Sequence, residues 1–178
     1  LKLTENTIVI FQSDHGASTE VRAHGGGGDS GPYRGAKFSL YEGGLRVPAI
    51  VSWPGRLPEN QVRDQIATGC DWYPTILELC GLAPADHLID GKSLVQLIHS
   101  TREPTPHKSF NWKSGKSTAI RENQWKLIST GNKIELFDIP NDPGEANNLE
   151  GELPEVVTRL REKSRMYWDR IQAESPSN

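Results

Sequence analysis

The sequence predicts an α/β domain followed by a small antiparallel sheet with one long C-terminal helix. Two short runs of β-branched and apolar residues, at positions 7–11 and 47–53, are typical of strands covered on both faces. Further strand-like segments gather after residue 107, and a helical pattern begins near residue 153. The length of 178 residues suits one domain or one and a half.

Polar residues collect where the first predicted strand ends. Asp14 and His15 follow the run at 7–11, at the edge where open α/β sheets place their ligands. An irregular stretch at 17–35 comes next and contains four consecutive glycines. Loops of this length inside a compact domain are usually functional or disordered, so we expect a loop beside a site.

The second strand and two helices complete the predicted α/β segment. Pro48 stands at the start of the run at 47–53, where a missing N–H is tolerated. A helix is expected within 71–81, with a capping Asp71 at its start and Gly81 past its end. A shorter helix is expected at 93–99.

The C-terminal third predicts a separate small subdomain. Four strand-like segments are expected at 108–112, 117–121, 125–129 and 134–137, with a hairpin turn before the last of them. The long helix has Pro154 in its first turn, and its apolar positions share one side at helical spacing. These positions are Val156, Val157, Leu160, Tyr167, Trp168 and Ile171. We therefore predict an incomplete α/β segment at 1–100, a charged, proline-bearing linker at 101–107 and an α+β subdomain at 108–178.

Composition excludes several classes of protein. Lys and Arg number 20 against 23 Asp and Glu, which predicts no nucleic-acid or membrane-surface partner. The sequence has no run of 18 apolar residues, so no membrane-spanning helix is expected. Cys70 and Cys80 flank a predicted helix and would lie roughly 15 Å apart, too far for a disulfide.

Asp14 and His15 are the first candidates for chemistry. A carboxylate favours hard cations and an imidazole favours transition metals, so the adjacent pair can bind a metal ion. A turn in which Asp14 caps its own backbone is the structural alternative. The tripeptide formed with Gly16 does not decide between these two interpretations.

Lys37, Glu42 and Arg46 are equally open to two interpretations. A lysine after a Gly- and Pro-rich loop is ordinarily solvated, but its compact ammonium group could also bind an anion. Glu42 and Arg46 could pair with each other and pin the loop to the sheet. His24 lies in the glycine-rich loop, where it could contact a substrate or remain solvated.

Taken together, these segments resemble the latter half of the sulfatase family, a branch of the alkaline phosphatase superfamily. The order and spacing of 8–16, 35–37 and 41–48 make the resemblance specific. Agreement continues over nearly the whole chain, at 53–55, 71–81, 90–94, 121–127, 135–138 and 141–143.

The resemblance implies hydrolysis of sulfate esters by a formylglycine nucleophile beside a divalent cation, usually Ca²⁺. It implies that Asp14 and His15 are two metal ligands and that Lys37 contacts the sulfate. The cation and the lysine would stabilise negative charge on the sulfuryl oxygens. Many sulfatases have Asn at the position of His15, which leaves the metal open between Ca²⁺ and an ion that tolerates nitrogen better.

The sequence also departs from the family pattern. Neither cysteine stands in the Cys/Ser-x-Pro-x-Arg motif that becomes formylglycine, and the early Asp-Asp pair of metal ligands does not occur. The family's Lys-x-His motif and its separate histidine would also precede this segment. Because Ca²⁺ takes six to eight oxygen ligands, two protein ligands hold it poorly. We therefore expect a fragment that is inactive alone.

Alternatives of two classes remain. One is a phosphonate or phosphodiester hydrolase of the same superfamily, and the other is a non-catalytic binding remnant. The expected substrate is a sulfate ester, either a sulfated carbohydrate or an aryl sulfate. By family, the full-length protein is expected in the periplasm or outside the cell. Removal of the family's preceding strands would expose edges and faces of the strands at 7–11 and 47–53, which predicts self-association or a rearranged N-terminal region.

Overall fold

A computed structural model describes residues 3–21, 24–83 and 89–174. The chain forms two compact units. One comprises Leu1–Phe11 and Ala49–Lys108, and the other comprises Gln12–Pro48 and Ser109–Asn178. The third passage of the chain between the units, after residue 108, falls beside the predicted linker at 101–107. The division into segments 1–100 and 108–178 stays a prediction, because 12–48 groups with the C-terminal unit.

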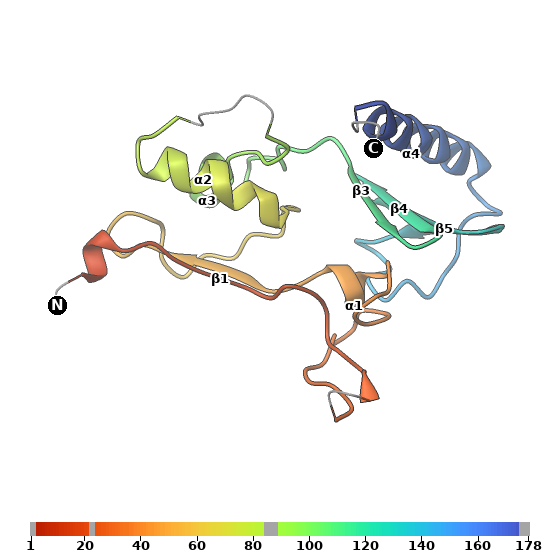
Figure 1. The fold of residues 1–178 in the computed structure, drawn as a ribbon, viewed down its shortest axis with the longest axis horizontal. Coiled ribbons are helices and arrows are strands. Elements are labelled where there is room, and N and C mark those ends of the chain that lie inside the picture. Colours follow the sequence, from red (N-terminus) through yellow and green to blue (C-terminus); the bar gives the residue numbers. More distant parts are fainter. Residues whose placement is uncertain (1–2, 22–23, 84–88, 175–178) are drawn as a thin grey trace. The chain divides into compact units, whose positions relative to one another are not determined.

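The first unit contains the two strands expected near the N-terminus. β1 (Val9–Gln12) pairs with β2 (Ala49–Ser52) in a two-stranded sheet, shown in red and orange in Figure 1. The sequence predicted strands covered on both faces, but Val9, Phe11 and Ile50 are 57–60% exposed. Within the described residues, no second layer buries these three side chains.

Both predicted helices of the first unit are confirmed. α2 spans Trp72–Leu79 and follows a 3-10 turn at Gly69–Asp71, while α3 spans Val95–His99. Asp71 closes a capping box with Thr68, which satisfies two N–H groups at the start of the helix. Cys70 and Cys80 are both free thiols, as expected. No helix in the described part of the chain is long and apolar enough to span a bilayer.

The second unit is built on an antiparallel sheet of four strands in sequential order. The strands are β3 (Phe110–Ser114), β4 (Ser117–Glu122), β5 (Trp125–Thr130) and β6 (Lys133–Asp138). Two-residue loops join neighbouring strands, and each loop begins with a left-handed residue: Gly115, Asn123 or Gly131. A positive φ at this position matches the right-handed twist of a tight hairpin.

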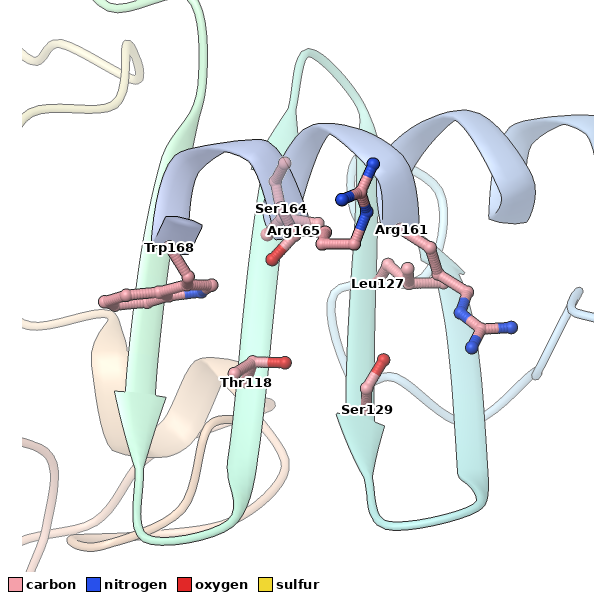
Figure 2. Close-up of a pocket in the computed structure, with 8 residues that line it drawn as sticks. Thr118, Leu127, Ser129, Arg161, Ser164, Arg165 and Trp168 are labelled. Atoms are coloured by element: carbon pink, nitrogen blue, oxygen red, sulfur yellow. The ribbon is translucent and has the colours of Figure 1, made fainter. Parts of the chain in front are cut away.

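Helix α4 (Pro154–Glu174) covers one face of this sheet. An apolar cluster joins the helix to the strands through Ile120, Leu127, Leu136, Val157 and Leu160. Toward the end of the helix this interface becomes polar and opens into a cavity of about 200 Å³. Figure 2 shows Thr118 and Ser129 on neighbouring strands beneath the helix that carries Arg161, Ser164, Arg165 and Trp168.

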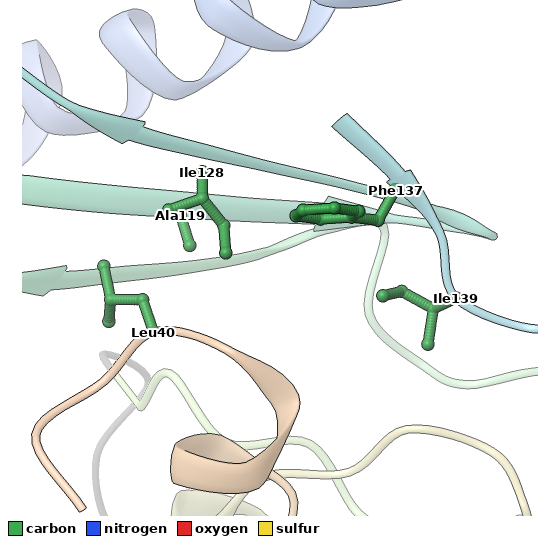
Figure 3. Close-up of a cluster of buried hydrophobic side chains, with 5 residues drawn as sticks. All are labelled: Leu40, Ala119, Ile128, Phe137 and Ile139. Carbon is green, nitrogen blue, oxygen red and sulfur yellow. The ribbon is translucent and has the colours of Figure 1, made fainter. Parts of the chain in front are cut away.

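The opposite face of the sheet packs against the segment that leads into a short helix, α1 (Glu42–Leu45). Figure 3 shows Leu40 pointing toward the underside of the strands, where the buried cluster also contains Ala119, Ile128, Phe137 and Ile139. Tyr41 and Leu45 are partly buried against the same cluster. The sheet of the second unit therefore lies between α4 and α1.

Candidate functional site

Asp14 and His15 occupy a tight turn just after β1. The backbone N–H of Ser13 donates to the carbonyl of Pro48 (3.2 Å), and the Ser13 hydroxyl donates to the carbonyl of His15 (2.8 Å). The His15 Nδ1 lies 2.8 Å from the carbonyl oxygen of Gly16. Because a carbonyl oxygen only accepts hydrogen bonds, Nδ1 carries a proton and Nε2 is left with the lone pair in the neutral ring.

This lone pair faces a carboxylate. The His15 Nε2 lies 3.3 Å from the Asp14 Oδ2, and the Asp14 side chain is 84% exposed. Two electron-rich atoms at this separation repel each other unless a proton or a cation lies between them. A carbonyl that fixes the tautomer of a ligating imidazole is a usual outer partner in metal sites. The arrangement therefore fits two ligands of one cation.

Asp14 and His15 form a pair of possible metal ligands and not a larger group within the described residues. No group of three or more His, Cys, Asp or Glu side chains that could hold a metal ion occurs among them. A Ca²⁺ ion needs more oxygen ligands than Asp14 and His15 offer. That Asp14 and His15 form half of a metal site stays a prediction.

Lys37 is joined to the same turn through its backbone. Its N–H donates to the carbonyl of Ala17 (2.9 Å), and its ammonium group donates to the Glu20 carboxylate (2.9 Å). Both charged side chains are about one-fifth exposed. An ammonium group has three donors, so Glu20 leaves capacity for a further anion. The next residue, Phe38, has a φ of 74°, an uncommon conformation for a bulky side chain.

Helix α1 lies between the segment of Asp14 and the segment of Lys37. On one side, the Gly16 N–H donates to the Gly44 carbonyl (3.2 Å), and a Cβ on Gly16 would overlap the carbonyl of Gly43. On the other side, the Gly43 N–H donates to the Arg34 carbonyl (2.7 Å). A Cβ on Gly44 would overlap the carbonyl of Ser39. Only glycines allow the three backbones to approach so closely.

A buried ion cluster holds α1 on the sheet. Lys126 is fully buried, and its Nζ lies 2.8 Å from Glu42 and 2.9 Å from Glu145. Arg121 also contacts Glu42, at 3.1 Å, and the Glu42 backbone N–H donates to the Glu145 carboxylate (2.6 Å). Burial raises the pKa of Glu145, and Lys126 opposes that rise. Burial likewise lowers the pKa of Arg121, against the effect of Glu42.

The expected pairing of Glu42 with Arg46 is present but long, at 4.0 Å. Glu42 pins the loop mainly through Lys126 and Arg121, so the predicted structural role is confirmed with other partners. A cavity of about 530 Å³ lies next to the turn, with His15, Ser18, Tyr33 and Arg46 among its lining residues. His24 is exposed, has a φ of 53° and does not line this cavity, so its substrate contact stays a prediction.

Comparison with known proteins identifies the family. A family model described as N-sulphoglucosamine sulphohydrolase, C-terminal, matches residues 33–167. The chain belongs to the sulfatase family. N-acetylgalactosamine-6-sulfatase of Canis lupus familiaris is 45% identical to this sulfatase chain over 127 residues, covering 71% of it and 24% of that protein. The Mus musculus protein of the same name is 42% identical over 166 residues, covering 92% and 31%.

Solved structures agree with this assignment. Ps i-CgsB has a TM-score of 0.78 at 27% identity, and the match covers 93% of the sulfatase chain and 37% of that chain. It has also been solved in complex with k-i-k-neocarrahexaose, with a TM-score of 0.77. PsFucS1 sulfatase from Pseudoalteromonas sp. shares the fold, with a TM-score of 0.79 at 21% identity over 98% of this chain and 39% of that one. The chain thus spans less than two-fifths of these relatives.

Several residues of the site were absent from the sequence prediction. Glu20 lies 17 positions from Lys37 in an irregular loop, and no periodic pattern points to their pairing. The sequence could have pointed to Lys126, because it lies two positions before Ile128 and therefore on the same face of a predicted strand. A lysine on an apolar face is either exposed or paired, and here it is paired twice.

Proposed function

We propose that this sulfatase chain forms part of a sulfuric ester hydrolase, with Asp14 and His15 as ligands of a divalent cation and Lys37 as the sulfate-contacting residue. The observation that carries the proposal is the approach of Asp14 Oδ2 to His15 Nε2, 3.3 Å apart. The backbone bond from Lys37 to Ala17 brings the lysine segment beside that pair.

Each residue has a defined task in this proposal. Lys37 binds a sulfuryl oxygen with its ammonium group, while Glu20 keeps the side chain in place through an ion pair. The Gly16 carbonyl holds the His15 ring so that Nε2 faces the cation. When bound, the cation, Ca²⁺ by family, polarises the sulfuryl oxygens and neutralises charge that develops on them.

The substrate we propose is a sulfated carbohydrate. Two of the relatives reported above are N-acetylgalactosamine-6-sulfatases, and a structural relative has been solved with k-i-k-neocarrahexaose. The cavity beside His15 presents polar groups and an arginine, Arg46, which suit an anionic sugar. The 178 residues alone are expected to bind Ca²⁺ weakly and to turn over no substrate, because they contain neither the family's nucleophile motif nor its early Asp-Asp pair.

The test compares two polypeptides. The chain alone should hydrolyse 4-methylumbelliferyl sulfate no faster than its Lys37→Ala variant. The chain expressed together with the coding sequence upstream of Leu1, in a host that forms formylglycine, should hydrolyse it in a Lys37-dependent way. Activity of the chain alone above the Lys37→Ala control would disprove the expected inactivity, and an inactive longer polypeptide would disprove the proposed function.

A further inference from the structure

We propose that Lys126, together with Glu145, is a positioning residue for the metal-binding turn and for Lys37. The inference rests on the proposed function, because it assigns a task in that site to two residues of the C-terminal unit. Among the described residues, neither side chain forms a hydrogen bond or ion pair with Asp14, His15 or Lys37. Both act through α1, which is held by the ion cluster and in turn holds the two functional segments.

The first link runs from the functional segments to α1. The turn of Asp14 and His15 continues into Gly16, whose N–H is bonded to Gly44. The segment before Lys37 is bonded to Gly43 through the carbonyl of Arg34, and Ser30 adds a bond from its hydroxyl to the Gly43 carbonyl (3.2 Å). A shift of α1 would therefore move both segments.

The second link runs from α1 to the sheet. The helix has four residues, and two of them are glycines without side chains, so Glu42 and Leu45 are the only side chains that can hold it. Leu45 makes apolar contacts that have no fixed direction. Glu42 is 3% exposed and is held from both its side chain and its backbone N–H, by Lys126 and Glu145 respectively.

The chemistry of the cluster suits a positioning role better than a stabilising one. Two acidic and two basic side chains, Glu42, Glu145, Arg121 and Lys126, balance in charge within a buried space. Well-packed apolar residues are often as stabilising as such a cluster, because buried charges lose their hydration. Ion pairs between buried groups fix direction and distance, which is what α1 needs in order to set the geometry of the turn.

Hydrogen exchange of single amides in the 178-residue chain provides the direct test. In the Lys126→Met variant, the amides of Gly16 and Lys37 should exchange at least about ten-fold faster, because the bonds that they report depend on α1. Amides of α4 such as Val157 and Leu160 should change little. The matched control is Lys133→Met, which removes a lysine from the neighbouring strand, where the side chain is 62% exposed.

A second variant separates position from loss of folding. Lys126→Met leaves the buried Glu145 carboxylate without its ion partner, whereas Lys126→Met/Glu145→Gln removes both charges. The glutamine can still accept the Glu42 N–H, so the double variant should recover part of the protection at Gly16 and Lys37. Equal loss of protection in α4 and in the turn for both variants would overturn the proposal, as would unchanged exchange at Gly16 and Lys37.

Kinetics in the longer polypeptide test the functional consequence. Lys126→Met should raise the Ca²⁺ concentration for half-maximal arylsulfate hydrolysis by about ten-fold or more, the range found for outer partners of metal ligands. Saturating Ca²⁺ should restore most of kcat, while Lys133→Met should leave the Ca²⁺ dependence unchanged. An unchanged Ca²⁺ dependence in Lys126→Met would overturn the positioning role. An inactive wild type would instead disprove the sulfatase proposal, and the exchange experiment would still decide the role of Lys126.

Discussion

The backbone N–H of Gly16 donates to the carbonyl of Gly44, 3.2 Å away, and joins the turn of Asp14 and His15 to helix α1. The two backbones lie so close that a Cβ on Gly16 would overlap the carbonyl oxygen of Gly43. No flexible side chain is available to move aside, since the obstructing atoms belong to the backbone. The position of the candidate metal ligands therefore depends on a residue that takes no part in the chemistry.

Gly16→Ala should destabilise the chain by about 1–3 kcal/mol, because the added methyl group forces the backbones apart. Urea denaturation would measure the loss. Gly27→Ala is the matched control, since Gly27 lies in the neighbouring loop and a Cβ there meets nothing within 4 Å. Equal stability of the two variants would contradict the close packing of the turn on α1.

The regular elements were predictable from local sequence. The strands at 117–121 and 125–129 form within one residue of their predicted ends, and the long helix starts at Pro154 as its proline indicated. The hairpin at Gly131 also follows from local chemistry, because glycine adopts a positive φ at little cost. These features depend on neighbours in sequence, which a single sequence displays.

The site itself depends on contacts that local sequence does not display. Lys126 and Glu42 are 84 positions apart, and Tyr41 and Glu135 are 94 apart. The exposure of Val9 and Phe11 depends on which other segments are present, because strand composition predicts a covered face without saying which segment covers it. The proposed roles of Asp14, His15 and Lys37 come from the resemblance to sulfatases, because the individual motifs leave them open.

Tyr41 and Glu135 should give the second unit a measurable pH dependence. Their side chains form a 2.6 Å hydrogen bond. Burial and this bond raise the pKa of Tyr41 to about 12. Burial pushes the pKa of Glu135 upward, but hydrogen bonds from Tyr41 and Lys133, with the charges of Lys133 and Arg34, lower it overall.

The sign of each effect follows from proton binding. The folded chain keeps the Tyr41 proton to higher pH than the unfolded chain. The contribution of Tyr41 to the free energy of unfolding is therefore fully present below pH ~10 and is lost as pH rises toward about 12. The folded chain releases the Glu135 proton at lower pH than the unfolded chain. The contribution of Glu135 to the free energy of unfolding is therefore present above pH ~4.3 and is lost as pH falls through the lowered pKa.

Tyr41→Phe should therefore flatten both limbs of a plot of unfolding free energy against pH. At neutral pH it should cost about 1.5–3 kcal/mol, as expected for a hydrogen bond to a charged group. Tyr73→Phe is the control, because Tyr73 is 51% exposed on α2. An alkaline limb that stays as steep in Tyr41→Phe as in the wild type would argue against the raised pKa.

Asp71 should be the most sensitive polar residue of the first unit. Its fully buried carboxylate accepts three hydrogen bonds of 2.8 Å, from the backbone N–H groups of Thr68 and Lys92 and from the Nε2 of His107. Asp71→Ala leaves all three donors without this acceptor and should destabilise the chain by about 3 kcal/mol. Thermal and urea unfolding would measure the effect.

The exposed Asp64 provides the comparison for that variant. Asp64→Ala should change stability by less than about 0.5 kcal/mol, the usual range for surface positions. If both variants unfold at the same urea concentration as the wild type, Asp71 does not hold the segments of Thr68, Lys92 and His107 together.

Self-association through the β1–β2 sheet is the remaining prediction. Val9 and Ile50 are 57% and 60% exposed, and apolar strands with uncovered faces and edges favour contacts between chains. The 178-residue chain should form dimers or larger species at about 10–100 μM in sedimentation velocity, which covers weak specific association. The double variant Val9→Thr/Ile50→Thr should shift it toward monomer, since threonine keeps the strand propensity while reducing apolar area.

The control variant Val62→Thr/Leu82→Thr changes two side chains that are 79% and 61% exposed outside these strands, and it should leave the association unchanged. A monomeric wild type across this range, or an equal shift in both double variants, would show that the sheet is not the contact surface.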